Sequence, residues 1–366
     1  MRRVFNLGPQ FDVKEPDGDG SLKTIKQFPV FTFASRATWA IWRRLPEPVR
    51  PRPLIELDVS TLDRLLANWM VPCSVFHGYT ATCLKSLRAA KRLGAVTLVE
   101  NASCHPQHWK EAEVEDCRRF GVSSRGGNGD LSESMMRRRE VEFQECDRIV
   151  VPDSVGFRSF AQMGYANKTA VVAAGVDADL FVPKPIEPPA KVFRVCCVGR
   201  LEFAKGVAYL LQAWKRLALP HAELVMVGGV LSQMKPFLKT HADSSVRFTG
   251  FLPPQEVPQW YRASNLSVMP SPNESLAQVL LEAMASGLPT VSTDMAGAMD
   301  CMQNGKEGLI VPARDVDALA DAILWCYQHR DESQAMGRAA RARVEREFTL
   351  EHYNQRLIAL YRSLAS

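Results

Sequence analysis

The chain has 366 residues, of which 46% are hydrophobic and 23% are charged. This composition is typical of a folded protein and excludes wholesale disorder, and the length suits two domains of roughly 150–200 residues each. No apolar run approaches the roughly 18 residues that cross a bilayer, so we expect no membrane-spanning helix. The N-terminal sequence soon turns polar, so we expect no signal peptide.

The net charge of +5 is unevenly distributed along the chain. The first 100 residues hold 15 basic and 9 acidic side chains, a balance of +6, whereas the remaining residues balance at −1. A basic N-terminal part suits an anionic membrane, an anionic substrate or nucleic acid, and it is equally compatible with an ordinary solvated surface. Nucleic acid is disfavoured, because no dense stripe of Lys and Arg is interleaved with aromatic residues.

Nine cysteines are present, an odd number, and no pair has the Cys-x-x-Cys spacing. This pattern fits neither a disulfide framework nor a zinc ribbon. It predicts free, mostly buried thiols in a cytoplasmic protein.

In chain order, the first 70 residues show little beyond a short strand over 4–7 and a loop over 17–20. From residue 73 onward, short apolar runs alternate with amphipathic stretches, which indicates βαβ units and a parallel sheet. We predict strands over 73–78, 96–99 and 148–151, helices over 81–93 and 135–146, and an exposed loop over 123–134.

A proline-rich segment then predicts a semi-rigid linker between two domains. Four prolines lie within residues 183–189. Beyond it we predict strands over 192–198, 223–227, 266–269 and 290–292, and helices over 206–218, 275–286 and from a cap at Asp315 to 329. Thr349 caps a final helix. The expected fold is α/β, with two Rossmann-like doubly wound domains that face a cleft. We divide it into residues 1–182, a linker 183–190, a second domain 191–348, and a C-terminal helix 349–366.

The first chemical signal lies between the strand ending at Val198 and the next helix. Gly199 permits a tight turn, and Arg200 and Lys205 flank the helix start. A helix N-terminus offers free N–H groups and a partial positive charge, so this segment is a candidate anion site. The alternative is two solvated cations beside a turn.

The second signal is a pair of carboxylates, Glu274 and Glu282, separated by an apolar stretch. Eight residues along one helix would place them about 12 Å apart. That spacing suits two parts of one extended ligand and exceeds the roughly 5–10 Å of a glycoside hydrolase pair. A solvated helix face is the alternative for Glu282, although an acid in so apolar a helix needs a partner.

Several short motifs, taken in order, resemble the retaining family 4 (group 1) glycosyltransferases of the GT-B fold. The motifs in the second half are Gly199-Arg200-Leu201, Lys205-Gly206, Val227-Gly228-Gly229, residues 248–252, 274–289 and 304–315. Those in the first half are residues 76–78, 100–106, 147–154 and 175–177. The resemblance therefore covers roughly residues 70–366.

The resemblance implies that the first domain binds the acceptor, the second binds a nucleotide-diphosphate sugar, and the final helix crosses back to the first domain. Arg200 and Lys205, beside Gly199, would hold the diphosphate. Glu282 would accept the ribose hydroxyls, and Glu274 would approach the donor sugar. The N–H groups of Ser275, Leu276 and Ala277 at the helix start would bind phosphate and sugar. The family often has Gly and Phe-Gly at these three positions. No Asp-x-Asp signature is suited to holding a divalent ion on the diphosphate, and the family is typically metal-independent, so no metal and no cofactor is expected.

His105 follows the strand that ends at Glu100, and we expect it to contact the donor or acceptor sugar near the reacting centre. His77, His108 and Glu100 compete with it, and a structural role is an equal alternative for His105. The predicted activity is retaining transfer of a sugar to a glycan or lipid-linked acceptor in polysaccharide biosynthesis. We expect a cytoplasmic enzyme. Peripheral contact with an anionic membrane is a further hypothesis. The alternatives are a nucleotide-sugar epimerase, a phosphorylase, or a catalytically inactive GT-B-like module that binds a nucleotide sugar or a partner.

Overall fold

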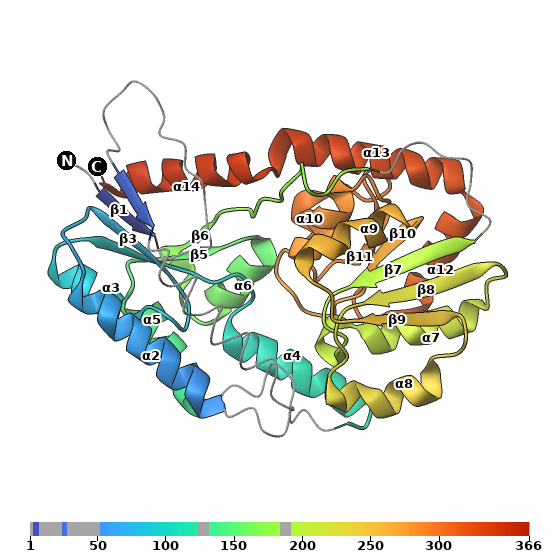
Figure 1. Cartoon of the computed structure of the whole chain (residues 1–366), viewed down its shortest axis with the longest axis horizontal. Helices are drawn as coiled ribbons and strands as arrows, with labels where there is room; N and C mark the ends of the chain where they lie inside the picture. Colours follow the sequence, from blue (N-terminus) through green and yellow to red (C-terminus); the bar gives the residue numbers. More distant parts are fainter. Residues whose placement is uncertain (1–2, 7–23, 28–51, 123–131, 184–191, 366) are drawn as a thin grey trace.

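The computed structural model describes residues 3–6, 24–27, 52–122, 132–183 and 192–365. These residues form two α/β domains, each built around a parallel sheet of six strands (Figure 1). The strands of the first sheet are β1 Arg3–Asn6, β2 Thr24–Gln27, β3 Val75–Tyr79, β4 Val96–Glu100, β5 Arg148–Val151 and β6 Thr169–Val171. The helices of this domain are α2 Arg52–Asn68, α3 Leu84–Arg92, α4 Pro106–Arg119, α5 Glu133–Glu145, α6 Ser154–Gln162 and the 3-10 turn η2 Ala166–Lys168.

The second domain repeats this plan. Its strands are β7 Phe193–Val198, β8 Ala222–Val227, β9 Val246–Gly250, β10 Leu266–Met269, β11 Thr290–Thr293 and β12 Leu309–Val311. Its helices are η3 Phe203–Lys205, α7 Val207–Leu217, η4 Ser232–Met234, α8 Lys235–His241, η5 Pro254–Glu256, α9 Val257–Arg262, α10 Gln278–Ala285, α11 Ala298–Cys301, α12 Val316–Gln328 and α13 Arg330–Glu347, and α14 Leu350–Ala365 ends the chain.

The strand orders define doubly wound sheets. The first sheet runs β2-β1-β3-β4-β5-β6 and the second runs β12-β11-β10-β7-β8-β9. The second order is that of a Rossmann fold, in which the chain reverses its direction of winding between two central strands, here β7 and β10. The predicted α/β class with two such domains is confirmed.

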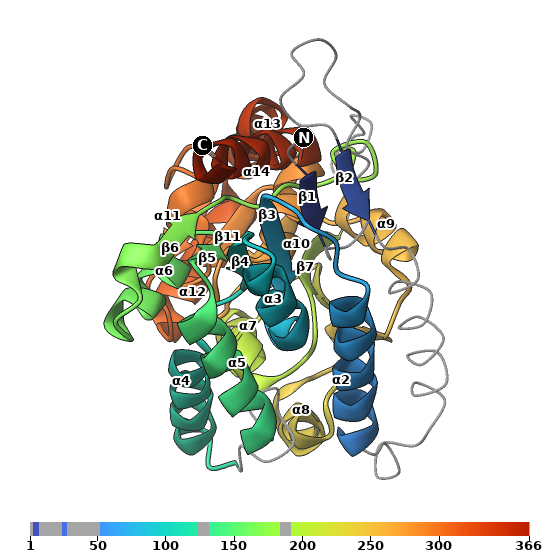
Figure 2. The same ribbon diagram turned by 90° about the vertical axis from the view of Figure 1, so that its left-hand side faces the viewer.

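Helices cover both faces of each sheet, which explains why the strands read as continuous apolar runs. In the first domain, Phe76 and Ile149 pack with Leu87 of α3 and Phe143 of α5. The opposite face is covered by α14, which crosses from the second domain (Figures 1 and 2). Tyr353, Leu357 and Tyr361 of α14 pack on that face against apolar residues of β3, β4 and β5.

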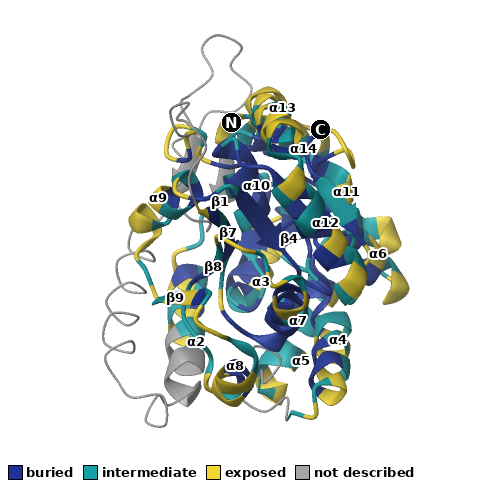
Figure 3. Ribbon diagram, turned by 90° about the vertical axis from the view of Figure 1, so that its right-hand side faces the viewer, coloured by how far each residue is buried: buried dark blue, intermediate teal, exposed yellow. Residues whose placement is uncertain are grey.

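The adjacent cysteines of β7 show how the second sheet is buried. Cys197 joins the cluster under α7 and α12, whereas Cys196 joins the cluster under α10 and α13. Successive residues of a strand point to opposite faces, so the pair cannot meet. All nine cysteines are buried and free, as predicted. Figure 3 shows the central strands β4 and β7 as buried, with exposed residues on the outer helices.

The predicted elements agree best where the apolar runs are short and strong, as in β5 and β10. The helix predicted over 275–286 begins later, at Gln278. The helices that were not predicted are α2, α4, α6, α8, α9, α11 and α13. The proline-rich linker, apart from its first residue, and most of the predicted 123–134 loop lie outside the described residues.

Candidate active site

The winding reversal of the second sheet determines where its chemical groups gather. The loops after β7 and β10 leave the sheet at the same edge, between strands that are direct neighbours. Ligands of doubly wound sheets bind at this point, outside the carboxyl ends of the strands. The first loop carries Arg200 and Lys205, and the second carries Glu274. Two sequence signals that lie about seventy residues apart thus meet in one place.

A glycine allows the two loops to touch. Gly206 has φ 70°, and an added Cβ would lie only 1.9 Å from the carbonyl oxygen of Pro270. Both the backbone conformation and the close approach therefore require glycine at this position. The contact brings η3, which ends at Lys205, against the loop that carries Glu274.

Lys205 and Glu274 form an ion pair in the cleft between the domains. The Lys205 ammonium contacts Glu274 Oε1, and the Ser271 hydroxyl donates to Glu274 Oε2 at 2.9 Å. The two side chains are 24% and 17% exposed, so both remain accessible from the cleft. The Glu274 backbone N–H is also fixed, because it donates to the carbonyl of Met295.

Arg200 lies beside this pair with its guanidinium directed outward. Its side chain is 47% exposed, and Nη2 donates to Glu202 Oε1 at 3.2 Å. Glu202 itself is fully buried. A buried carboxylate thus steadies the base of Arg200, whose guanidinium remains available to a ligand. Gly199, with φ 139°, has open space where a side chain would lie.

The segment just before α10 is buried and consists of Ser275, Leu276 and Ala277. The sequence predicted instead that these residues begin the helix. They adopt a bent, non-helical path because the segment is held from both domains. The Ser275 hydroxyl donates to Asp153 at the start of α6, across the domain boundary. Among the described residues, no hydrogen-bond acceptor is found for the three N–H groups of this segment. Consequently Glu274 and Glu282 do not share one helix, and the spacing of about 12 Å along an axis does not apply.

Glu282 lies on α10 in an apolar environment. The hydroxyl of Tyr261 donates to its Oε2 at 3.1 Å, and burial raises the pKa of Glu282 to about 7. The predicted need of this acid for a partner is met by that tyrosine. The Glu282 side chain remains partly exposed, so a ligand hydroxyl can still reach its carboxylate.

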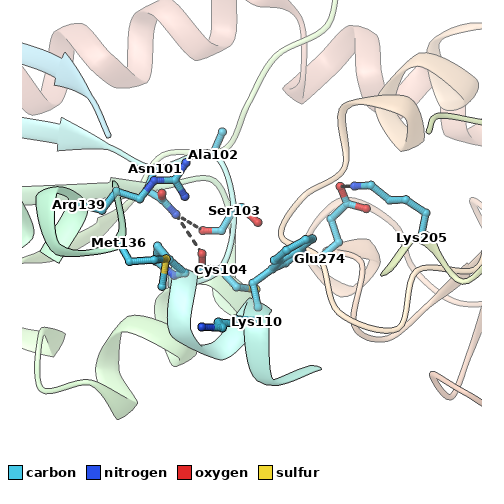
Figure 4. A pocket seen from close by; sticks show the side chains of 11 residues that line it. Asn101, Ala102, Ser103, Cys104, Lys110, Met136, Arg139, Lys205 and Glu274 are labelled. Carbon is cyan, nitrogen blue, oxygen red and sulfur yellow. Dashed lines mark hydrogen bonds and ion pairs between the residues drawn. The ribbon is translucent and has the colours of Figure 1, made fainter. Parts of the chain in front are cut away.

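The first domain supplies the opposite wall of the site. A cavity of about 320 Å³ lies between the loop after β4 and the loops of the second domain (Figure 4). The Asn101 amide donates to the carbonyls of Ser103 and Cys104 and so shapes the loop. The lining residues are Asn101, Ala102, Ser103, Cys104, Pro106, Trp109, Lys110, Met136 and Arg139, together with Lys205 and Glu274.

His105 does not line this cavity, which contradicts the predicted contact with a sugar. Its ring is buried against Phe143, Phe160 and Tyr165, and its Nε2 lies 3.3 Å from Glu140. Its Nδ1 accepts from the N–H of Gln107 and caps α4, and burial lowers the pKa of His105. The structural alternative for His105 is therefore the better one.

The competing residues His77 and Glu100 are joined to the C-terminal helix. His77 is fully buried, with Nδ1 2.5 Å from the Tyr361 hydroxyl and Nε2 3.1 Å from Glu100 Oε2. The Tyr353 hydroxyl donates to both oxygens of Glu100 at 2.9 Å. These groups fasten α14 to the first sheet. His108, on α4, is absent from the cavity lining.

Sequence reasoning missed the contacts that hold the two walls together. Arg314 binds Asp116 of α4 in two hydrogen bonds of 2.7 and 2.9 Å, and Tyr209 donates to the same carboxylate at 2.6 Å. Phe120 packs on Phe203 with ring centroids 5.6 Å apart. Since these partners lie far apart in the chain, no local pattern pairs them.

The described part of the chain holds no group of three or more His, Cys, Asp or Glu side chains arranged to bind a metal ion. Within that same part, no helix has the length and apolar character needed to span a bilayer. Neither finding distinguishes between candidate reactions.

Two doubly wound domains facing a cleft, with cations and a carboxylate at the winding reversal of the second, define the GT-B class of fold. A solved structure of that fold, HepE of Anabaena in complex with UDP-glucose, superposes with a TM-score of 0.67 at 18% identity. The superposition covers 99% of this chain and 100% of that protein. At this identity the likeness establishes the fold alone.

Sequence comparison shows which proteins the second domain is similar to. Residues 192–329, which lie in that domain, match the family described as glycosyl transferases group 1. The D-inositol 3-phosphate glycosyltransferase of Corynebacterium urealyticum is 32% identical over 219 residues, which are 54% of this chain and 51% of that protein. The alpha-maltose-1-phosphate synthase of Mycolicibacterium smegmatis is 26% identical over 354 residues, 88% of this chain and 87% of that protein. The chain thus spans about half the length of the first relative.

Proposed function

We propose that this protein is a retaining glycosyltransferase that moves a sugar from a nucleotide-diphosphate donor to a glycan or lipid-linked acceptor. One observation carries the proposal. Arg200, Lys205 and Glu274 meet at the winding reversal of the second domain, and the first domain forms the opposite wall of the cleft. The match of residues 192–329 to group 1 glycosyltransferases supports it. The UDP-glucose bound by HepE supports a nucleotide-sugar donor.

In the proposed division of labour, residues 191–348 bind the donor and residues up to 182 bind the acceptor. Arg200 and Lys205 hold the diphosphate, together with the N–H groups of Ser275, Leu276 and Ala277. Glu282 accepts the ribose hydroxyls, and Glu274 contacts the donor sugar.

The chemistry requires that negative charge on the departing diphosphate be stabilised as positive charge develops at the anomeric carbon. Fixed cations and backbone N–H groups provide that stabilisation without reorganising during the reaction. Lys205 is neutralised by Glu274 before the donor arrives, so phosphate binding would release Glu274 toward the sugar. We propose that this site works without a metal ion, since its own cations supply the required charge.

Donor binding tests the proposal directly. We expect UDP-sugars or GDP-sugars to raise the melting temperature of the full chain, and Arg200→Ala or Lys205→Ala to remove that shift. A ligand at a hundred times its dissociation constant adds about 2.7 kcal/mol, which such an assay resolves. The matched control is Arg216→Ala, because Arg216 is 59% exposed on α7 and pairs with Asp317 away from the cleft.

Turnover then separates an enzyme from an inactive module. We expect slow release of nucleotide from the bound donor in wild type and at least a tenfold loss in Glu274→Ala. Binding without release, unaffected by Glu274→Ala, would support the inactive module. Peripheral membrane contact is a separate proposal, which flotation with anionic and neutral vesicles would test.

A further inference from the structure

Three consecutive arginines of α5 differ sharply in their surroundings. Arg137 is 71% exposed and pairs with Glu133 one turn earlier on the same helix. Arg138 is 14% exposed and binds both Asp63 and Glu142. Both charges are therefore accounted for by carboxylates of the described chain.

Arg139 differs from its two neighbours. Its side chain lines the cleft cavity, and its Nε is buried. No described residue accepts a hydrogen bond from it or forms an ion pair with it, and burial lowers the pKa of its guanidinium. Arg139 is half-buried, and Glu142 on the same helix attracts its charge without forming an ion pair with it. A buried Nε that donates no hydrogen bond is costly, so this position is explained best by a ligand that accepts one and supplies negative charge.

A second cation of the first domain borders the same cavity. Lys110 of α4 lines it, and no ion pair joins Lys110 to any described carboxylate. Figure 4 shows both residues on the first-domain side, across the cavity from Lys205 and Glu274. Lys110 is exposed to solvent, whereas Arg139 is half-buried. Since Glu274 already pairs with Lys205, the cations of the cavity that form no ion pair lie on the first-domain side.

We propose that Arg139 and Lys110 form an anion site that recognises a phosphate group on the acceptor. This inference rests on the proposed function, because it assigns the acceptor wall of the same cleft. Two unpaired cations match a phosphate dianion in charge, and the fork of an arginine suits its oxygens. Trp109, Pro106 and Met136 provide an apolar surface beside these cations for the rest of the acceptor.

The test uses the full chain with UDP present at saturation, so that the donor diphosphate site is filled. Isothermal titration then measures inorganic phosphate and two matched pairs, glucose 6-phosphate with glucose and inositol phosphate with inositol. Vesicles of phosphatidylcholine, with and without phosphatidic acid, distinguish a lipid phosphate from a soluble one. We expect one phosphorylated probe to bind at least tenfold more tightly than its neutral counterpart.

The variants assign this preference to Arg139. We expect Arg139→Gln to weaken the phosphorylated probe by at least tenfold, to leave the neutral probe unchanged and to leave UDP affinity within twofold. Arg139→Lys should recover part of the loss. Arg118→Gln is the matched control, since Arg118 is 76% exposed on α4 and pairs with Glu115.

Two results would overturn the inference. One is that no phosphorylated probe binds better than its neutral partner while UDP still binds, which would leave the donor proposal intact. The other is that Arg139→Gln weakens UDP instead, which would move Arg139 to the donor. If UDP fails to bind wild type at all, the proposed function itself is wrong. Unfolding of Arg139→Gln is recognised by its circular dichroism, and Lys110→Gln then serves as the second variant.

Discussion

Replacing Glu282 with glutamine should make the free protein more stable and the donor complex weaker. Burial raises the pKa of Glu282 from 4.5 to about 7. The folded protein therefore holds this proton more tightly than the unfolded chain, and stability is lost as pH rises from 4.5 through 7. Each pKa unit of this shift corresponds to about 1.36 kcal/mol, so ionised Glu282 lowers the free energy of unfolding by about 3 kcal/mol above pH 7.

Urea unfolding of wild type and Glu282→Gln at two pH values measures this effect. Glutamine keeps the shape and the contact with Tyr261 but carries no charge. We expect the stability advantage of the variant to grow by about 2 kcal/mol between about pH 5.5 and about pH 8. An advantage that does not change with pH, or that shrinks, would refute the assignment of the charge penalty to Glu282.

The same substitution should weaken UDP by roughly tenfold to a hundredfold, because a hydrogen bond to a charged acceptor contributes about 1.5–3 kcal/mol. The 2′,3′-dideoxy analogue of UDP lacks the ribose hydroxyls and provides the control. Wild type and variant should bind the analogue equally. If both nucleotides lose affinity to the same extent, Glu282 does not contact the ribose.

The remaining predictions concern the framework of the site. Asp116→Ala should destabilise the protein by about 3–5 kcal/mol in chemical unfolding, because it leaves Arg314 without its partner, and Asp116→Leu combined with Arg314→Met should recover most of that loss. His105→Gln should leave the affinity for UDP within twofold while lowering the melting temperature, whereas a loss of turnover at unchanged stability would restore His105 to the reacting centre. Gly206→Ala should cost about 3 kcal/mol or more and weaken UDP, since its Cβ would displace Pro270; retention of both properties would contradict the close contact of the two loops.

Sequence patterns predicted strands β7, β8, β10 and β11 of the second domain because their signals are local. Val192 to Val198 is an apolar run that ends at a glycine, and Asp315 stands where a helix cap belongs. The place of Arg200 and Lys205 at the edge of the sheet could be predicted for the same reason, since both follow directly on a strand. The start of α10 could not be predicted, because tertiary contacts to Asp153 override the helical propensity of residues 275–277.

His105 illustrates the opposite failure, in which a local signal was present but misleading. Its place after a strand end is typical of a ligand-binding residue. Its ring is nevertheless turned into the first core, because Phe143 and Phe160 offer it an aromatic pocket. Both phenylalanines lie more than thirty residues downstream, so no spacing rule could reveal the pocket. Arg139 was overlooked for a related reason, since only the structure separates it from the two arginines that precede it.

Helix α4 links the first-domain wall of the cavity to the loop that carries Lys205 more closely than a proline-rich linker would suggest. Its first turn lines the cavity through Pro106 and Trp109, and near its other end Cys117 is buried in the core of the second domain. The chain just beyond α4 packs Phe120 on η3, the turn that ends at Lys205. A cleft that opened by simple rotation about the linker would expose these apolar groups and separate Asp116 from Arg314. The position of Lys205 is therefore coupled to a helix of the first domain, and α4 must either stay with the second domain or leave it at the cost of a buried ion pair.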